Sequence, residues 1–179
     1  MIEVEAKIKV SDSKFFIEKS KKIGKYIGKQ TKVDDYYTLE GKGKYPQKSL
    51  RIRKLNGIYQ VNFKHRLSFK EGIHAKKEVE FKAKNIKEIL SLISEFGFRK
   101  WLTKKKVTFL YEIEKHLHIE INNVQGLGSF IEIECLVEKN NEVNKARIKI
   151  MKTLTSLGIS NKNLIKEGYT KMLWDKTHS

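Results

Sequence analysis

The sequence has little cysteine, little proline and no long apolar run. Its 179 residues include one cysteine, Cys135, and one proline, Pro46. A single cysteine excludes an intramolecular disulfide and a zinc site built from cysteines. Without a linker or an internal repeat, we predict one domain over residues 1–179. No segment approaches the roughly 20 apolar residues of a membrane helix, and MIEVEAK does not resemble a signal peptide, so we expect a cytoplasmic protein without membrane attachment.

Arginine is also scarce, although the chain is strongly basic. Only five of the 38 basic residues are arginine, and the net charge is +17. Such a charge favours polyanionic partners, either nucleic acid, phosphorylated metabolites or an anionic membrane. The alternative is a lysine-rich surface unrelated to any ligand. With 39% hydrophobic and 33% charged residues, the composition excludes a mostly disordered chain.

Alternating apolar and charged residues predict eight strands. In Ile2–Val10, aliphatic residues take one face of the strand and glutamates and lysines take the other. The same pattern predicts seven more strands: residues 33–39, 50–53, 59–64, 78–82, 104–112, 117–122 and 130–134. Asn56-Gly57 is typical of a two-residue hairpin turn. We therefore expect a mainly antiparallel sheet.

Four amphipathic helices are predicted between and after the strands. They run from Asp12 or Ser13 to Gly24, from an Asn85/Glu88 capping box to Gly97, from Val143 to Gly158, and from Tyr169 to Trp174. If the apolar strand faces filled a barrel, these helices would have little left to cover. For a single strand, charges facing water in an open sheet would be sufficient. For the whole set, we predict an α+β fold: an eight-stranded closed antiparallel β-barrel, a tunnel with a polar charged interior and helices packed on the apolar outside.

The charged strand faces carry residues of both signs. The acids are Glu3, Glu5, Glu78, Glu80, Glu120, Glu132 and Glu134, and the bases are Lys7, Lys9, Arg51, Arg53, Lys64, Lys104 and Lys106. Burying unpaired ions is costly, so such a cavity must hold water and ligands. Paired carboxylates suit Mg²⁺ or Mn²⁺, whereas arginine and lysine suit phosphate oxygens. Together they predict a metal-bridged polyphosphate, either a nucleotide or a linear triphosphate.

An ordered set of motifs runs along nearly the whole chain. It comprises the ExExK of Glu3–Lys7, Asp35–Tyr37, Leu50–Arg53, Asn62–Lys64, Glu78–Glu80, Lys104–Lys106, Gly126–Glu134 and Tyr169. In this order the motifs resemble the CYTH superfamily, the triphosphate tunnel metalloenzymes. That superfamily includes class IV adenylyl cyclases, thiamine triphosphatases and inorganic triphosphatases. The resemblance implies an eight-stranded tunnel with catalysis inside it.

The resemblance also implies roles for particular residues. Mg²⁺ or Mn²⁺ would be bound by Glu3, Glu5, Asn122, Glu132 and Glu134. The triphosphate clamp would consist of Lys7, Arg51, Arg53, Lys64, Lys104 and Lys106, with Lys7, Glu78 and Glu80 as the catalytic set. Asn122 replaces the usual aspartate and brings no charge, which leaves one metal or two open. Lys106 replaces a frequent arginine and loses its bidentate fork.

Three functions remain open from the sequence. The first is metal-dependent hydrolysis of inorganic tripolyphosphate, thiamine triphosphate or a nucleoside triphosphate. The second is a class IV adenylyl cyclase, which makes cyclic AMP from ATP in the same kind of tunnel. The third is a non-catalytic module that binds RNA or another polyanion. We expect a triphosphate-containing small molecule as the main partner rather than nucleic acid, and a homodimer is common for a chain of this size.

Overall fold

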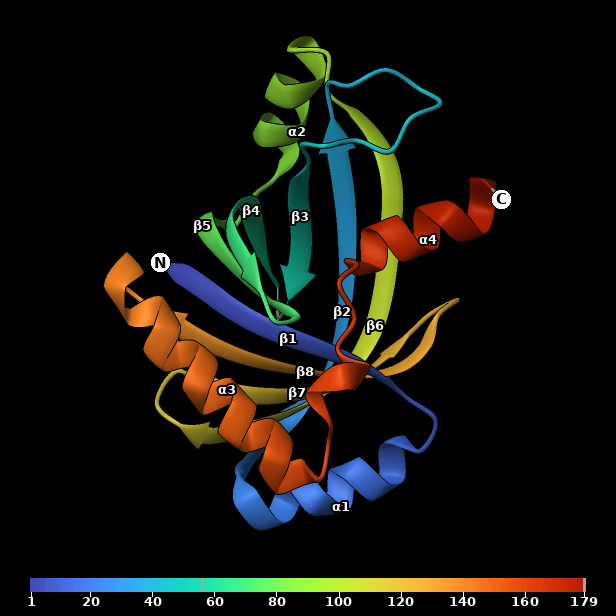
Figure 1. The fold of residues 1–179 in the computed structure, drawn as a ribbon. Coiled ribbons are helices and arrows are strands. Elements are labelled where there is room, and N and C mark those ends of the chain that lie inside the picture. Colours follow the sequence, from blue (N-terminus) through green and yellow to red (C-terminus); the bar gives the residue numbers. More distant parts are fainter. Residues whose placement is uncertain (56, 179) are drawn as a thin grey trace.

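The strands close into one barrel around a central space. The structure is a computed structural model that describes residues 1–55 and 57–178. In this part of the chain eight strands close in the order β1-β5-β4-β3-β2-β6-β7-β8, and every neighbouring pair is antiparallel (Figure 1). They are β1 (Ile2–Val10), β2 (Lys25–Thr38), β3 (Leu50–Leu55), β4 (Ile58–Lys70), β5 (Ile73–Ala83), β6 (Arg99–Glu114), β7 (Leu117–Val124) and β8 (Gly128–Val137). The predicted closed antiparallel barrel is confirmed.

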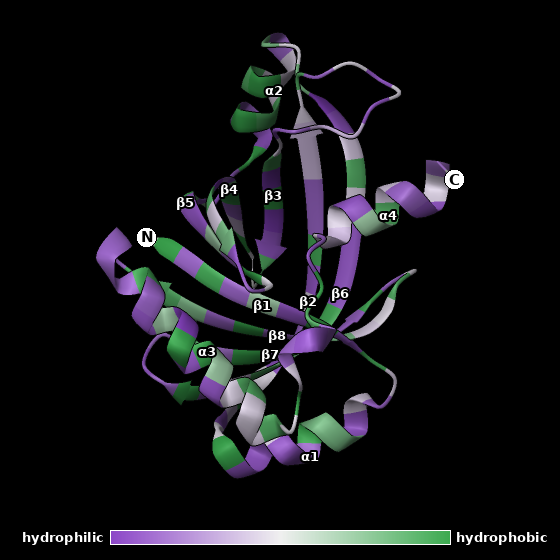
Figure 2. Cartoon of the chain, in the orientation of Figure 1, coloured by the Kyte–Doolittle hydropathy of each residue, from purple (hydrophilic) through white to green (hydrophobic). Residues whose placement is uncertain are grey.

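Strand β1 illustrates how alternating apolar and charged residues separate onto the two faces of the barrel wall. Its apolar and charged residues alternate along the ribbon in Figure 2, and all residues from Ile2 to Ile8 are buried on both faces. The aliphatic face packs outward with the outer faces of β6–β8 against two helices, α1 (Ser13–Ile23) and α3 (Val143–Leu157). The charged face points into the barrel. The predicted inside-out arrangement is therefore confirmed.

A second apolar cluster covers the other end of the barrel. Helix α2 (Lys87–Glu95) packs Ile89, Leu90 and Ile93 on the outer face of β3 and β4, where Ile52 and Val61 are buried. This cover does not extend over all of β5, since Val79 and Phe81 remain more than half exposed. The apolar exterior is thus covered by helices mainly around β1, β3, β4 and β6–β8.

The helix ends agree with the sequence except at α2. Asp12 caps α1 by accepting a hydrogen bond from the Phe15 amide, and Gly158 ends α3 in the left-handed conformation with φ of 73°. The predicted capping box at α2 is wrong, because Asn85 accepts from the Lys87 amide and the cap position is Ile86, which makes no side-chain cap. Helix α4 (Tyr169–His178) begins where expected and extends further.

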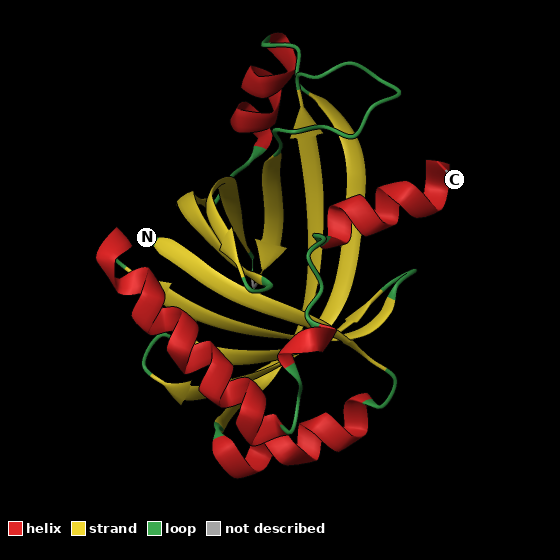
Figure 3. Cartoon of the chain, viewed as in Figure 1, coloured by secondary structure: helices red, strands yellow, loops and turns green. Residues whose placement is uncertain are grey.

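The strands are longer than the alternation predicted. β2 begins at Lys25, because pairing with β6 holds a lysine-rich segment that has no apolar alternation of its own. The predicted hairpin turn includes Asn56, which lies outside the described residues; β3 and β4 pair on either side of it from Leu55 and Ile58. Figure 3 shows the helices at the periphery of these strands. No helix in the described part of the chain has the length and apolarity needed to cross a membrane.

Candidate active site in the tunnel

The barrel encloses a polar cavity of about 870 Å³. The predicted site residues that line it are Glu3, Glu5, Lys7, Arg51, Arg53, Lys64, Glu78, Glu80, Lys104, Lys106, Glu132 and Glu134, together with Glu120 from the acidic set. Asn122 is also completely buried inside the barrel. Lys9 is the exception, since it is exposed and does not line the cavity. β1 ends at Val10, so Lys9 lies at the rim.

Five carboxylates form an acidic cluster, defined as Glu3, Glu5, Glu120, Glu132 and Glu134. Oxygen atoms of Glu3, Glu5 and Glu134 lie within 4.8 Å of one another, and the same holds for Glu120, Glu132 and Glu134. Burial, followed by the charges of Glu3 and Glu120, raises the pKa of Glu134 well above its ordinary value. Burial also raises the pKa of Glu3 to about 7, although Lys64 acts against it. Neighbouring lysines, acting against burial, hold the pKa values of Glu5, Glu120 and Glu132 below the ordinary value. The poorly compensated negative charge of the cluster therefore lies at Glu3 and Glu134.

The donor set of the acidic cluster fits a hard divalent cation. All its ligand atoms are carboxylate oxygens, the type that Mg²⁺ and Mn²⁺ prefer. Glu3 Oε1 is buried and makes no hydrogen bond within the described residues. A buried oxygen without a partner is costly unless something binds it. Its position beside Glu5 and Glu134 is where a cation would satisfy it.

Asn122 connects the acidic cluster to β6. Its amide nitrogen donates to Glu132 Oε2 at 2.8 Å and to Glu120 Oε2 at 3.3 Å, and its oxygen accepts from the Thr108 hydroxyl at 2.6 Å. In this arrangement the amide neutralises no charge but holds two carboxylates in place. To offer its oxygen to a cation, the amide group would have to turn over.

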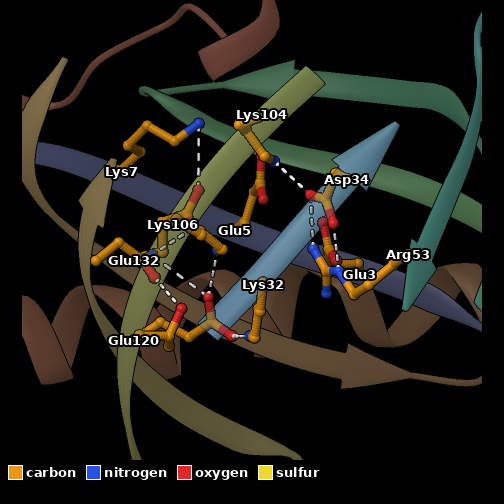
Figure 4. A network of polar contacts seen from close by, with 12 residues as sticks. Glu3, Glu5, Lys7, Lys32, Asp34, Arg53, Lys104, Lys106, Glu120 and Glu132 are labelled. Carbon is orange, nitrogen blue, oxygen red and sulfur yellow. Dashed lines mark hydrogen bonds and ion pairs between the residues drawn. The ribbon is translucent and has the colours of Figure 1, made fainter. Parts of the chain in front are cut away.

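Lysines on three strands neutralise Glu120 on β7 and Glu132 on β8. Lys106 donates to Glu120 at 2.7 Å and to Glu132 at 3.2 Å, and Lys32 donates to the other oxygen of Glu120 at 2.5 Å (Figure 4). Lys7 Nζ lies 3.3 Å from Glu132. Although burial disfavours the charged form of Lys106, Glu120 and Glu132 hold its pKa above the ordinary value. Lys106 therefore stays charged inside the barrel.

A second ion network spans β2, β3 and β6. Asp34 is completely buried and accepts from Arg53 Nε at 2.5 Å and from Arg53 Nη2 at 2.9 Å. Lys104 Nζ lies 3.0 Å from the same carboxylate and donates to the Tyr36 hydroxyl at 2.9 Å. Burial alone would raise the pKa of Asp34, but Lys104 and then Arg53 hold it well below the ordinary range.

A third network lies on β1, β4 and β5. Lys64 Nζ is 2.5 Å from Glu3 and 2.7 Å from Glu78, and Lys76 is paired with Glu5. Arg51 and Glu80 lie 3.8 Å apart, and the most accessible side chains of this network are Glu80 at 31% and Lys64 at 26%. The predicted clamp thus extends from the buried acidic cluster to an accessible mouth.

Among the tunnel residues, sequence reasoning missed Lys32, Asp34 and Lys76, and it named Tyr169 in the motif set without giving it a role. Lys32 and Asp34 have the same phase on β2 as Tyr36, but the strand was predicted only from Val33. Lys76 precedes the predicted start of β5 by two residues. Extending both strands would have found Lys32 and Lys76, whereas Asp34 lies inside the predicted strand and was not assigned to the interior. Nothing in the local sequence places Tyr169 in the tunnel, because it belongs to a helix.

An ion-lined barrel with helices outside is the architecture of a triphosphate-tunnel protein, and the sequence comparisons identify the family. The family model of the CYTH domain matches residues 1–169. A protein of Methanocaldococcus jannaschii named "Putative adenylate cyclase MJ0240" is 30% identical over 174 residues, which cover 96% of this chain and 98% of that protein. The chain therefore belongs to the CYTH family.

Two solved structures share the fold. PH1819 from Pyrococcus horikoshii is 27% identical with a TM-score of 0.76, over 97% of this chain and 99% of that one. HpAC1 from Hippeastrum, described as having a dominant triphosphatase activity, is 16% identical with a TM-score of 0.66, over 98% of this chain and 95% of that one. At that identity the likeness shows the fold alone.

Proposed function

We propose that this protein is a divalent-metal-dependent hydrolase of a triphosphate, with inorganic tripolyphosphate, thiamine triphosphate or a nucleoside triphosphate as substrate. The observation that carries the proposal is the charge arrangement of one cavity, where a crowded acidic cluster faces six clamp cations. Without a ligand, the cations are neutralised by carboxylates. A metal-bound triphosphate brings a cation to the carboxylates and anionic oxygens to the clamp. The triphosphatase activity described for HpAC1 and the family membership support this choice.

The clamp binds the phosphate chain along the tunnel. Arg51 has 12% of its side chain accessible, and its Nε is buried without a partner among the described residues. Arg53 and Lys104 are spaced across Asp34, so they bind the chain deeper inside. A guanidinium offers paired donors to phosphate oxygens, whereas lysine ammonium groups act as point charges. We also assign phosphate binding, as point charges, to Lys64 and Lys106.

A divalent ion, Mg²⁺ or Mn²⁺, would be held by Glu3, Glu5, Glu132 and Glu134. When bound, such an ion neutralises phosphoryl oxygens and stabilises the charge that develops on the leaving phosphate. The buried Glu3 Oε1 and the raised pKa of Glu134 support this assignment. Asn122 would position Glu120 and Glu132 from behind, or bind the ion after its amide turns over.

In hydrolysis, a water oxygen bonds to the terminal phosphorus and the bond from that phosphorus to its bridging oxygen breaks. The bridging oxygen leaves with the electron pair as part of a diphosphate, and the proton of the water passes to solvent. Lys7 would stabilise the charge on the leaving oxygen, since its ammonium projects into the cavity beside Glu132. Glu78 would orient Lys64, and Glu80 would orient Arg51. Positioning and electrostatics then supply most of the catalysis.

The second candidate is an adenylyl cyclase, favoured by the name of the Methanocaldococcus jannaschii relative. In that reaction the ribose 3′ oxygen of ATP bonds to the α-phosphorus and its proton passes to solvent, while the bond from that phosphorus to its bridging oxygen breaks and pyrophosphate leaves with the electron pair. The two reactions use the same clamp and differ in which phosphorus is attacked. The proposal also takes residues 1–179 as one tunnel domain, since strands from residue 2 to residue 137 close the barrel and α4 returns to it.

The test is incubation with ATP, thiamine triphosphate or tripolyphosphate and Mn²⁺, with the products separated by chromatography. Hydrolysis gives a diphosphate and phosphate, whereas cyclase activity gives cyclic AMP and pyrophosphate. The matched pair Lys7→Gln and Lys9→Gln changes neighbouring lysines of one strand, only one of which lines the cavity. Lys7→Gln should lose activity and Lys9→Gln should retain it. No turnover of any of the three substrates would overturn both reactions.

A further inference from the structure

Residues 159–168, here called the strap, return from the end of α3 to the barrel and lead into α4. Figure 1 shows this segment crossing in front of the barrel strands. The Ile165 amide donates to the Lys7 carbonyl at 2.8 Å, and Leu164 forms a β-bridge with Ile8. The Lys166 carbonyl lies 2.8 Å from His74 Nε2 on β5. The strap is therefore fixed to both β1 and β5.

Gly72, in the turn between β4 and β5, makes room for the strap. Its φ is +81°, and a Cβ placed on it would lie 2.6 Å from Leu164 Cβ. A glycine is required there for both reasons. With contacts on two sides, the strap fixes where the next residue, Tyr169, enters the tunnel.

Tyr169 closes one end of the tunnel. It is 5% exposed and packs with Val124 and Phe130, whose positions on β7 and β8 have the inward phase of Asn122 and Glu132. The rings of Phe130 and Tyr169 meet edge to face at 5.0 Å. An apolar wall thus ends the ionic interior at this point.

Three clamp lysines surround the Tyr169 ring. The Nζ atoms of Lys7, Lys104 and Lys106 lie 4.1, 5.4 and 5.7 Å from its centroid. At these distances a desolvated ammonium is attracted to the negative face of the ring. Each of the three also has a carboxylate partner. The ring gives them a second contact that would not compete with phosphate for their charge.

The Tyr169 hydroxyl has no such partner. Its oxygen is buried and makes no hydrogen bond with any of the described residues. The Asn122 amide and the Glu132 carboxylate lie nearby. A phenol hydroxyl is a hydrogen-bond donor at neutral pH. A buried donor without an acceptor, among three cations, is poised for an anionic oxygen.

We propose that Tyr169 is a substrate-binding and positioning residue: its hydroxyl donates a hydrogen bond to the phosphate chain, and its ring holds the ammonium groups of Lys7, Lys104 and Lys106 in place. The proposal rests on the proposed function for the identity of the ligand, a linear phosphate chain. It assigns the recognition of that chain in part to the helical segment after the barrel. The ring and the hydroxyl have separate tasks and can be tested separately.

The experiment is isothermal titration calorimetry of tripolyphosphate in EDTA, with thermal unfolding and, where the wild type turns over, kcat and KM. Tyr169→Phe keeps the ring and removes the hydroxyl, and Tyr169→Leu removes both. Met172→Ala loosens the same apolar cluster without touching the lysines. Tyr169→Phe should bind tripolyphosphate about tenfold more weakly and should raise KM more than it lowers kcat. It should unfold at no lower a temperature than wild type, because the substitution removes a buried donor that has no partner. Tyr169→Leu should lose about a further fivefold.

The controls separate this proposal from the proposed function. Met172→Ala should bind within about twofold of wild type. Equal binding by Tyr169→Phe and wild type, or equal losses in Met172→Ala and Tyr169→Leu, would overturn the role of Tyr169 alone. Binding without turnover would overturn the hydrolase proposal and leave this one standing if the Tyr169 variants weaken binding. A wild type that binds tripolyphosphate neither in EDTA nor with Mn²⁺ would overturn both.

Discussion

Replacing Asp34 with asparagine should destabilise the unliganded protein and make its stability depend on phosphate. Asp34 is completely buried and is the shared partner of Arg53 and Lys104, which lie 2.5 to 3.0 Å from its oxygens. Asparagine keeps the shape and removes the charge. Two buried cations then face each other across a neutral amide. Removing one partner of a buried ion pair costs about 3–5 kcal/mol.

The assay is urea or thermal unfolding with and without tripolyphosphate in EDTA. A loss of this size lowers Tm by about 6–20 °C for a chain of this length. Tripolyphosphate should restore more stability in Asp34→Asn than in wild type, because its oxygens replace the missing carboxylate. Asp35→Asn is the matched control. Asp35 points outward, and its partly exposed pair with Lys100 at 2.7 Å should contribute no more than about 1 kcal/mol.

Two outcomes would refute this reasoning. The first is a loss below about 1 kcal/mol for Asp34→Asn, which would mean that the network is solvated rather than buried. The second is an unchanged response to tripolyphosphate despite a large loss of stability. In that case Arg53 and Lys104 would not bind the phosphate chain, and their place in the clamp would be wrong.

Three further predictions follow from the same structure. The depressed pKa of Asp34 means that its stabilising contribution is present above its unfolded pKa of about 3.9 and is lost as pH falls toward the folded pKa. The stability difference between wild type and Asp34→Asn should therefore shrink below about pH 4 in acid unfolding curves. A difference that stays constant with pH would contradict the pairing. Glu3→Gln should weaken Mn²⁺ binding by about tenfold or more in calorimetry, and unchanged binding would remove Glu3 from the metal site. Gly72→Ala should displace the strap and destabilise the protein by more than about 1 kcal/mol. The control is Gly43→Ala, which should cost less, because φ is also positive there but no atom lies within 4 Å of an added Cβ. Equal losses of stability would show that backbone strain alone is responsible.

Much of the tunnel could be predicted from local patterns. In β1 the phase of Glu3, Glu5 and Lys7 against Val4 and Ala6 assigns each side chain to a face. That assignment follows from the two-residue period of a strand, which requires no knowledge of the partner strand. The amphipathic helices then require an apolar surface outside the sheet, which places the charges inside. The same reasoning placed Lys104 and Lys106 correctly on β6.

The pattern was less informative where a strand is held by its neighbours. The first half of β2 has no apolar alternation and becomes a strand because it pairs with β6 from Lys25 onward. Lys32 was missed for that reason, since it precedes the predicted start at Val33, whereas Asp34 lay inside the predicted strand and was not assigned to the interior. At the end of β1 the alternation continues to Lys9, but the cavity does not. Where the barrel ends is a property of all eight strands together.

The sequence by itself determined the period of each strand, and with it which side chains turn inward and that the interior is ionic. Only the tertiary structure decided which ions meet. Lys32 pairs with Glu120, 88 residues away, and Lys64 pairs with Glu3, 61 residues away. In both pairs the two strands are separated by a third strand, so the side chains meet only inside the barrel. It also decided that Tyr169, on a helix, completes the tunnel wall. The reason is that side-chain phase is fixed within a few residues of backbone, whereas pairing and end closure depend on strand order and on the strap, which no local pattern encodes.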